Sequence, residues 1–248
     1  MYTLGVHTRW WRWVFISIAG LCIAWLVWSD RHLLLTAWLI VQATPFEQVG
    51  APDGPTIVVL GDSTAYGTGA RRSVDSVAGR LGHASPTATI INSSGNGWTL
   101  ADVRAAVPAV PPASLVVVMA GGNDILRGRA LTDSEADLRA ILSALQTHAD
   151  TVIFFPPGNV GSAPVWSSRR SEELTARTKA FREMAMAVAH ETSVGYVDIF
   201  LPAEQDPMVQ QRWRYLAIDG LHPSAAGYAL WFAALDSVLQ DSAPAVVD

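Results

Sequence analysis

The sequence is short of charge, and it contains a single cysteine and a single lysine. Because Cys22 has no partner among the 248 residues, the chain cannot form an internal disulfide. No Cys-x-x-Cys or His-x-x-x-His spacing occurs, so a metal site is not expected. Charged residues make up 16% of the chain and the net charge is −5. With no basic stripe to neutralise phosphates, a nucleic-acid partner is not expected either.

One long uncharged run lies near the N-terminus. The sixteen residues from Trp13 to Trp28 carry no charge, and the wider stretch 10–28 carries only Arg12. As a helix, this stretch would extend about 28 Å, close to the thickness of a bilayer's hydrocarbon core. Tryptophans at both ends resemble the aromatic belts of membrane proteins. We therefore predict a transmembrane helix over about 10–28, within an N-terminal anchor formed by residues 1–32.

The charges that flank this run indicate its orientation. Arg9 and Arg12 lie at its leading end, whereas Asp30 and Arg31 follow it and cancel. The positive-inside rule then places the N-terminus in the cytoplasm. The sequence therefore predicts a single-pass, membrane-anchored protein with an extracytoplasmic domain. A cleaved signal peptide, a lipoprotein signal that uses Cys22 and a buried core helix are the alternatives.

Residues 33–55 are expected to form an interfacial segment followed by a linker. The nine residues Leu33–Val41 are apolar but too few to span a bilayer. They are expected to lie along the membrane interface or to pack on the domain. Ala43–Pro55 is rich in proline and glycine, which is typical of a linker.

From Thr56 onward, short apolar runs alternate with longer helical patterns. The continuous apolar character of the runs is typical of strands buried on both faces. The expected strands are 56–60, 88–92, 115–120, 151–155 and 194–197. The expected helices are 73–81, 99–107, 133–147 with a capping box of Thr132 and Glu135, 168–191 and 224–240. This order predicts one α/β domain over 56–242, with a five-stranded parallel sheet between two layers of helices.

Polar, glycine-rich motifs follow the first three predicted strands, and another precedes the last helix. They are Gly61-Asp62-Ser63, "NSSGNGWT" at 92–99, "GGND" at 121–124 and "DGLHP" at 219–223. Each motif alone is also typical of a turn. Functional residues in such folds collect at the carboxyl ends of strands, however, and three of the four motifs lie there.

Together these motifs contain the groups that nucleophilic catalysis needs. Ser63 is a weak nucleophile until a base takes its proton, and the imidazole of His222 is the natural candidate for that base. Asp219 precedes His222 by three residues, close enough for its carboxylate to orient the imidazole. We predict that Ser63, Asp219 and His222 form a catalytic triad.

The four motifs resemble, in order, the signature blocks of the SGNH (GDSL) hydrolase family, over roughly residues 56–240. The resemblance implies a three-layer, flavodoxin-like fold and catalysis through an acyl-serine without a cofactor. It also implies an oxyanion hole made by the backbone N–H groups of Ser63 and Gly97 and the side-chain amide of Asn123. Gly95 is the alternative to Gly97.

Thr64 stands where the family name has leucine, a position that carries no chemistry. The resemblance favours Gly97 for the oxyanion hole, because Thr99, two residues after it, matches the pattern of the family. An α/β-hydrolase is disfavoured because its Gly-x-Ser-x-Gly motif would need glycine where Ala65 stands.

The expected function is that of a serine esterase acting on a lipid ester, a lysophospholipid or an acyl thioester. The predicted anchor favours these substrates because it would hold the site near a bilayer. An O-acetyl esterase or acyltransferase acting on cell-wall or other glycans is the alternative. A non-catalytic lipid- or glycan-binding protein is a further alternative, which the complete set of catalytic residues disfavours.

Two long connections, 154–172 and 201–218, are expected to contribute to the pocket or to form ordinary surface loops. Their large side chains could line the substrate. We take Trp166, Arg169 and Trp213 as candidate substrate-binding residues.

Overall fold

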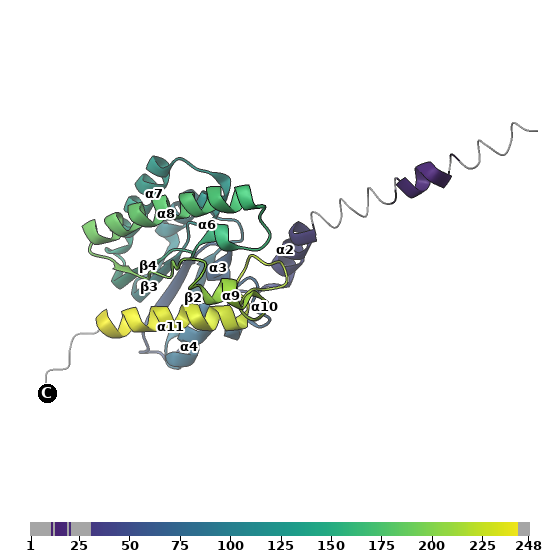
Figure 1. Cartoon of the computed structure of the whole chain (residues 1–248). Coiled ribbons are helices and arrows are strands. Elements are labelled where there is room, and N and C mark those ends of the chain that lie inside the picture. Colours follow the sequence, from purple (N-terminus) through teal and green to yellow (C-terminus); the bar gives the residue numbers. More distant parts are fainter. Residues whose placement is uncertain (1–10, 12, 19, 21–30, 243–248) are drawn as a thin grey trace, which may run out of the picture.

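The computed structural model describes residues 11, 13–18, 20 and 31–242 (Figure 1). Residues 11, 13–18 and 20 are helical. No helix within these described ranges combines the length and hydropathy needed to cross a bilayer. Most of the predicted span over 10–28 lies outside the described residues, and the anchor remains a prediction.

Five parallel strands form one sheet, as predicted. The strands are β1 (Thr56–Gly61), β2 (Thr89–Ser94), β3 (Ala113–Met119), β4 (Ala149–Phe155) and β5 (Gly195–Tyr196). Their order, β2-β1-β3-β4-β5, is the flavodoxin-like order. Gly61 is level with Ser94 on one side and Met119 on the other, so three carboxyl ends meet at one edge.

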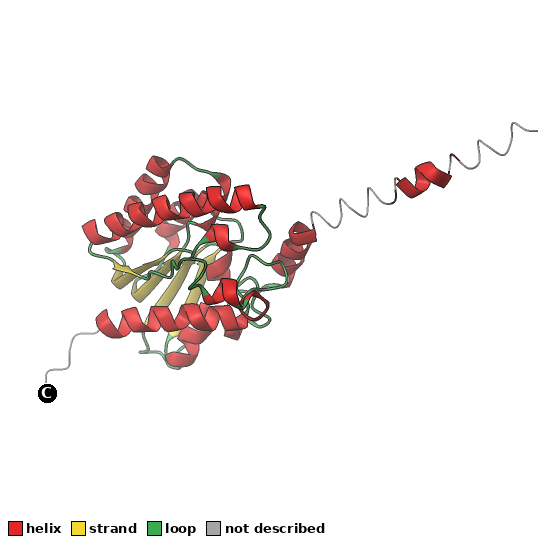
Figure 2. Cartoon of the chain, in the orientation of Figure 1, coloured by secondary structure: helices red, strands yellow, loops and turns green. Residues whose placement is uncertain are grey.

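Helices cover both faces of the sheet (Figure 2). One face packs against α5 (Leu100–Ala106), α7 (Leu131–Leu145) and α8 (Ser168–Glu191), and the other against α4 (Val77–Ala84) and α11 (Ala225–Ser242). Along β1, Val58 and Leu60 face the first layer, whereas Ile57 and Val59 face the second. Because a strand sends successive side chains to opposite faces, each continuous apolar run fills two cores.

The shorter helices lie in the connections. They are α3 (Ser63–Tyr66), α6 (Gly122–Arg127), α9 (Pro207–Gln210), α10 (Arg212–Tyr215) and the 3₁₀ turns Ser73–Asp75, Val107–Ala109 and Val160–Ser162. The apolar segment after the predicted anchor forms helix α2 (Arg31–Gln42).

The predicted capping box at Thr132 and Glu135 is wrong. Helix α7 begins at Leu131, because the Ala130 carbonyl already accepts the N–H groups of Asp133 and Ser134. Thr132 therefore lies inside the first turn and cannot cap it. The capping box of this domain is instead formed by Thr99 and Asp102 at the start of α5.

Residues 43–55, the predicted linker, pack on the domain. Gln48 pairs antiparallel with Ile90 of β2 through two backbone hydrogen bonds of 3.1 and 2.9 Å. Its side-chain amide donates to the Ala88 carbonyl at 2.8 Å, and Phe46 packs on the core beneath α4. The segment thereby pairs backbone groups that the edge strand β2 would otherwise expose.

Candidate active site

A turn that requires glycine positions Ser63. Gly61 has a φ of +150°, and a Cβ there would lie 1.9 Å from the carbonyl oxygen of Met119 on the neighbouring strand. The next residue, Asp62, caps α3 by accepting hydrogen bonds of 2.8 Å from both the N–H and the hydroxyl of Thr64. The chain therefore leaves β1 sharply and presents Ser63 at the first position of α3.

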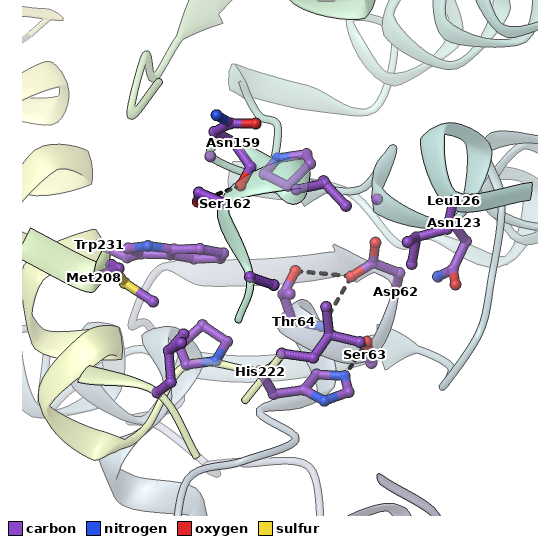
Figure 3. A pocket seen from close by; sticks show the side chains of 18 of the residues that line it. Asp62, Ser63, Thr64, Asn123, Leu126, Asn159, Ser162, Met208, His222 and Trp231 are labelled. Atoms are coloured by element: carbon purple, nitrogen blue, oxygen red, sulfur yellow. Dashed lines mark hydrogen bonds between the residues drawn. The ribbon is translucent and has the colours of Figure 1, made fainter. Parts of the chain in front are cut away.

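Ser63, His222 and Asp219 come together into one hydrogen-bonded chain. Figure 3 shows the contact between Ser63 and His222. The Ser63 Oγ lies 2.9 Å from Nε2 of His222, and Nδ1 of His222 lies 2.6 Å from Oδ2 of Asp219. All three side chains are buried. A base in this arrangement can take the hydroxyl proton, while the carboxylate fixes the imidazole tautomer.

The loop around Asp219 holds its carboxylate in the charged form. Burial alone raises the pKa of Asp219, but hydrogen bonds from His222 and from the backbone outweigh it, so the pKa lies below its usual value. The backbone donors are the N–H groups of Leu221 and His222, at 3.0 and 3.1 Å from Oδ1. Asp219 thus stays ionised and able to stabilise an imidazolium.

Asp62 sits beside the triad without joining it. Burial raises its pKa to about 6, against the opposing hydrogen bonds from Thr64 and the charge of His222. Its carboxylate accepts hydrogen bonds from the N–H and the hydroxyl of Thr64. Asp62 therefore holds the turn in which Ser63 lies.

The three residues predicted to supply the oxyanion hole, Ser63, Gly97 and Asn123, all line the same pocket. Within the described residues, neither the backbone N–H of Ser63 nor that of Gly97 donates to another backbone carbonyl. The amide of Asn123 gives one N–H to the Trp98 carbonyl at 2.9 Å, which leaves the other available. Gly97 has a φ of +81°, whereas Gly95 neither has a positive φ nor lines the pocket.

A buried ion-pair network supports helix α6, which carries Asn123. The carboxylate of Asp124 accepts the N–H of Leu100 at 3.0 Å and the guanidinium of Arg129 at 2.8 Å. Arg129 also reaches Asp137 on α7 at 2.8 Å. These contacts tie α6 to α5 and α7, a role for Asp124 that the sequence analysis did not assign.

The pocket that contains Ser63 has a volume of about 220 Å³ and mainly apolar walls. The two long connections 154–172 and 201–218 both contribute to these walls, as one of the two expectations for them had it, and further elements of the domain complete them. The large apolar side chains of the domain that line it are those of Leu126, Val160, Ile199, Met208, Leu216, Leu221 and Trp231. Thr36 and Ile40 of α2 also line it. The residues that the structure describes contain no group of His, Cys, Asp and Glu able to hold a metal ion.

None of the three candidate substrate-binding residues lines this pocket. The indole N–H of Trp166 donates to the Val160 carbonyl at 2.9 Å, so the ring is committed to its own loop. Arg169 lies on the exposed face of α8. Trp213 on α10 is 81% exposed. Of these residues, Trp166 alone acts near the pocket, by supporting the Val160 segment.

Residues 59–230 match the family model described as the GDSL-like lipase/acylhydrolase family. The chain belongs to this family. Membership indicates an ester hydrolase, in agreement with the serine, histidine and aspartate geometry. No curated protein matches the chain in a sequence comparison.

Solved structures share the fold of this GDSL-family chain. TesA is 22% identical with a TM-score of 0.59, over 75% of this chain and 98% of that chain. A member of the lipolytic G-D-S-L family from Veillonella parvula is 19% identical with a TM-score of 0.61, over 75% and 98%. Axe2, an acetylxylan esterase from Geobacillus stearothermophilus, is 20% identical with a TM-score of 0.55, over 77% and 96%. At these identities, the likeness establishes the fold alone.

Proposed function

We propose that this GDSL-family protein hydrolyses carboxylic esters through an acyl intermediate on Ser63. One observation carries the proposal: the Ser63 hydroxyl, hydrogen-bonded to His222 and through it to Asp219, opens into an apolar pocket. A binding protein would not need a buried base aligned on a hydroxyl.

In the proposed reaction, Nε2 of His222 takes the proton as Oγ of Ser63 attacks the ester carbonyl carbon. The negative charge that develops on the carbonyl oxygen is stabilised by the N–H groups of Ser63 and Gly97 and by the amide of Asn123. His222 then gives the proton to the leaving alcohol as its C–O bond breaks. Water attacks the acyl-serine with the help of His222, releases the acid and restores Ser63.

The apolar walls support a substrate with a sizeable acyl chain, such as a lipid ester, a lysophospholipid or an acyl thioester. Leu126, Met208 and Trp231 offer hydrocarbon surface, and each buried methylene contributes about 0.8 kcal/mol. An O-acetylated or glycan substrate would need polar partners instead. Polar side chains of the pocket wall are already engaged within the protein: Asp206 caps α9, and the hydroxyl of Ser162 donates to the carbonyl of Asn159.

Turnover of p-nitrophenyl esters from acetyl to palmitoyl tests this proposal. We expect kcat/KM to rise from acetate to an intermediate chain length, by up to about fourfold per methylene. Met208→Trp should fill the pocket and lower turnover of octanoate more than that of acetate. The matched control Trp213→Ala changes an exposed side chain and should alter neither. A preference for acetate would contradict the acyl-chain proposal and favour an O-acetyl esterase.

We also propose that residues 10–28 anchor the protein in a membrane, with the hydrolase domain on the extracytoplasmic side. The outer face of α2 supports this proposal, because it exposes apolar side chains directly after the uncharged run. These are Leu33, Leu34, Trp38 and Val41, with exposed fractions of 59%, 62%, 52% and 82%. An apolar face of this kind is suited to the interface of a bilayer.

A phosphatase that is active only outside the cytoplasm, fused after Asp248, tests the orientation. We expect phosphatase activity in intact cells and recovery of the fusion in the membrane fraction. Deletion of residues 1–30 should move the fusion to the soluble fraction. Activity of a cytoplasmic reporter at the same position would overturn the orientation.

A further inference from the structure

Helix α2 lies against the active site, although it precedes the region that matches the family model, 59–230. One face of the helix is half-buried and carries His32, Leu35, Thr36 and Leu39, at the spacing of a single helix face. The ring of His32 contacts the edge of Trp166 with 6.3 Å between centroids. At its other end, the chain continues into the segment paired with β2. The helix is therefore held at both ends.

Thr36 lies at the centre of this face and donates its hydroxyl proton to Oδ2 of Asp219, at 3.0 Å. A helical threonine often gives that proton to a carbonyl of its own preceding turn. Thr36 instead uses its single donor on a residue 183 positions away. The recipient is the same oxygen that binds Nδ1 of His222.

We propose that Thr36 is a positioning residue of the active site and that α2 completes the catalytic machinery, an inference that rests on the proposed function. Oδ1 of Asp219 is held by two N–H groups of its own loop. Oδ2 accepts hydrogen bonds from Nδ1 of His222 and from the hydroxyl of Thr36, so each carboxylate oxygen has two donors. Among the donors that these four hydrogen bonds bring to the carboxylate, the hydroxyl of Thr36 comes from outside the loop. It fixes the rotation of the carboxylate and thus the direction in which His222 points.

The same helix forms part of the pocket, since Ile40 lies one turn after Thr36 and both line it. Helix α2 therefore both orients Asp219 and forms part of the pocket wall.

The test compares Thr36→Val and Thr36→Ser in the full chain, with Leu34→Ala on the exposed face of α2 as the matched control. Valine keeps the shape of threonine and removes the donor. With p-nitrophenyl acetate, we expect kcat of Thr36→Val to fall about tenfold with little change in KM, as for loss of a hydrogen bond to a charged group. Thr36→Ser and Leu34→Ala should stay close to the unmodified protein.

The proton shared by His222 and Asp219 gives a readout that needs no substrate. Without the Thr36 donor, more of the carboxylate's charge faces this proton. Its low-field NMR resonance should then move further downfield, and the acidic limb of kcat/KM should shift to higher pH. None of the substitutions removes another titratable group near His222, so a shift of the acidic limb reports the loss of the Thr36 hydroxyl. The neighbouring groups are Asp62, the buried Tyr228, Asp206 in the pocket, and Arg31 and His32 on α2.

An unchanged resonance in Thr36→Val, or an equal loss of activity in Thr36→Val and Thr36→Ser, would overturn the inference. In the second case, α2 packing and not the hydroxyl would be responsible. Failure of the proposed function is distinguishable, because the unmodified protein would then turn over no ester while the resonance comparison still decides the role of Thr36.

Discussion

Replacing Ser63 with alanine is expected to lower kcat by about 10⁶-fold, as loss of the nucleophile does in a serine protease with the same relay. The Ser63 hydroxyl is the group that meets Nε2 of His222, at 2.9 Å. With the hydroxyl removed, no acyl-enzyme can form, and the remaining oxyanion donors have no tetrahedral intermediate on Ser63 to stabilise.

The measurement is steady-state turnover of the best p-nitrophenyl ester by Ser63→Ala and by the double variant Ser63→Ala/His222→Ala. Because the two residues act as a unit, the double variant should be no slower than the single one. The free energy of unfolding of Ser63→Ala should change by no more than about 1 kcal/mol, since the substitution removes the hydrogen bond between this hydroxyl and His222. Activity of Ser63→Ala within about tenfold of the unmodified protein would contradict the nucleophile assignment.

Replacing Asp219 with asparagine is expected to lower kcat by about 10⁴-fold. The asparagine oxygen can still accept the N–H groups of Leu221 and His222, so the loop should keep its shape. Its NH₂ group would then replace Oδ2 beside Nδ1 of His222. Two donors cannot face each other, so the imidazole takes the other tautomer and Nε2 can no longer accept the Ser63 proton.

The same p-nitrophenyl assay measures this loss, with Asp150→Asn as the control because that carboxylate is exposed at the start of β4. KM should change little, because Asp219 does not line the pocket within the described part of the chain. If Asp219→Asn loses less than about tenfold in kcat, the carboxylate does not set the tautomer.

The sequence was sufficient to predict the five-stranded sheet and the convergence of Ser63, Asp219 and His222. Parallel strands bring their carboxyl ends to one edge whatever the helices do, so motifs after β1, β2 and β3 must meet there. Asp219 and His222 are three residues apart, and the geometry between them is local. Ser63 meets this pair because the loop that carries Asp219 and His222 immediately precedes α11, which begins at the same edge of the sheet.

The pocket walls could not be predicted in the same way. They are set by how distant segments pack, and a large side chain in a loop has no sequence pattern that fixes its direction. Trp213 illustrates this point, since it is adjacent in sequence to the active-site loop yet 81% exposed. The connection 201–218 does reach the pocket through Met208, but the sequence did not indicate which of its side chains would do so. Trp231 lines the pocket from α11 and gave no sign of this role.

Helix α2 shows a third limit of the sequence. Its apolar residues run all round the helix, so the pattern was compatible both with a membrane interface and with packing on the domain. The structure shows that one face packs on the domain and leaves the other exposed. The polar Thr36 within the apolar run was the one signal of a specific contact, but it did not identify Asp219 as its partner.

The central claim is that a hydroxyl at position 63 is activated by its contact with His222. Incubation with a fluorophosphonate, followed by intact mass and peptide mapping, tests it most directly, because this reagent captures activated serine nucleophiles. The account predicts a single adduct on Ser63, its near absence in His222→Ala and its complete absence in Ser63→Ala. An adduct on a different residue, or none on a protein that hydrolyses esters, would contradict it.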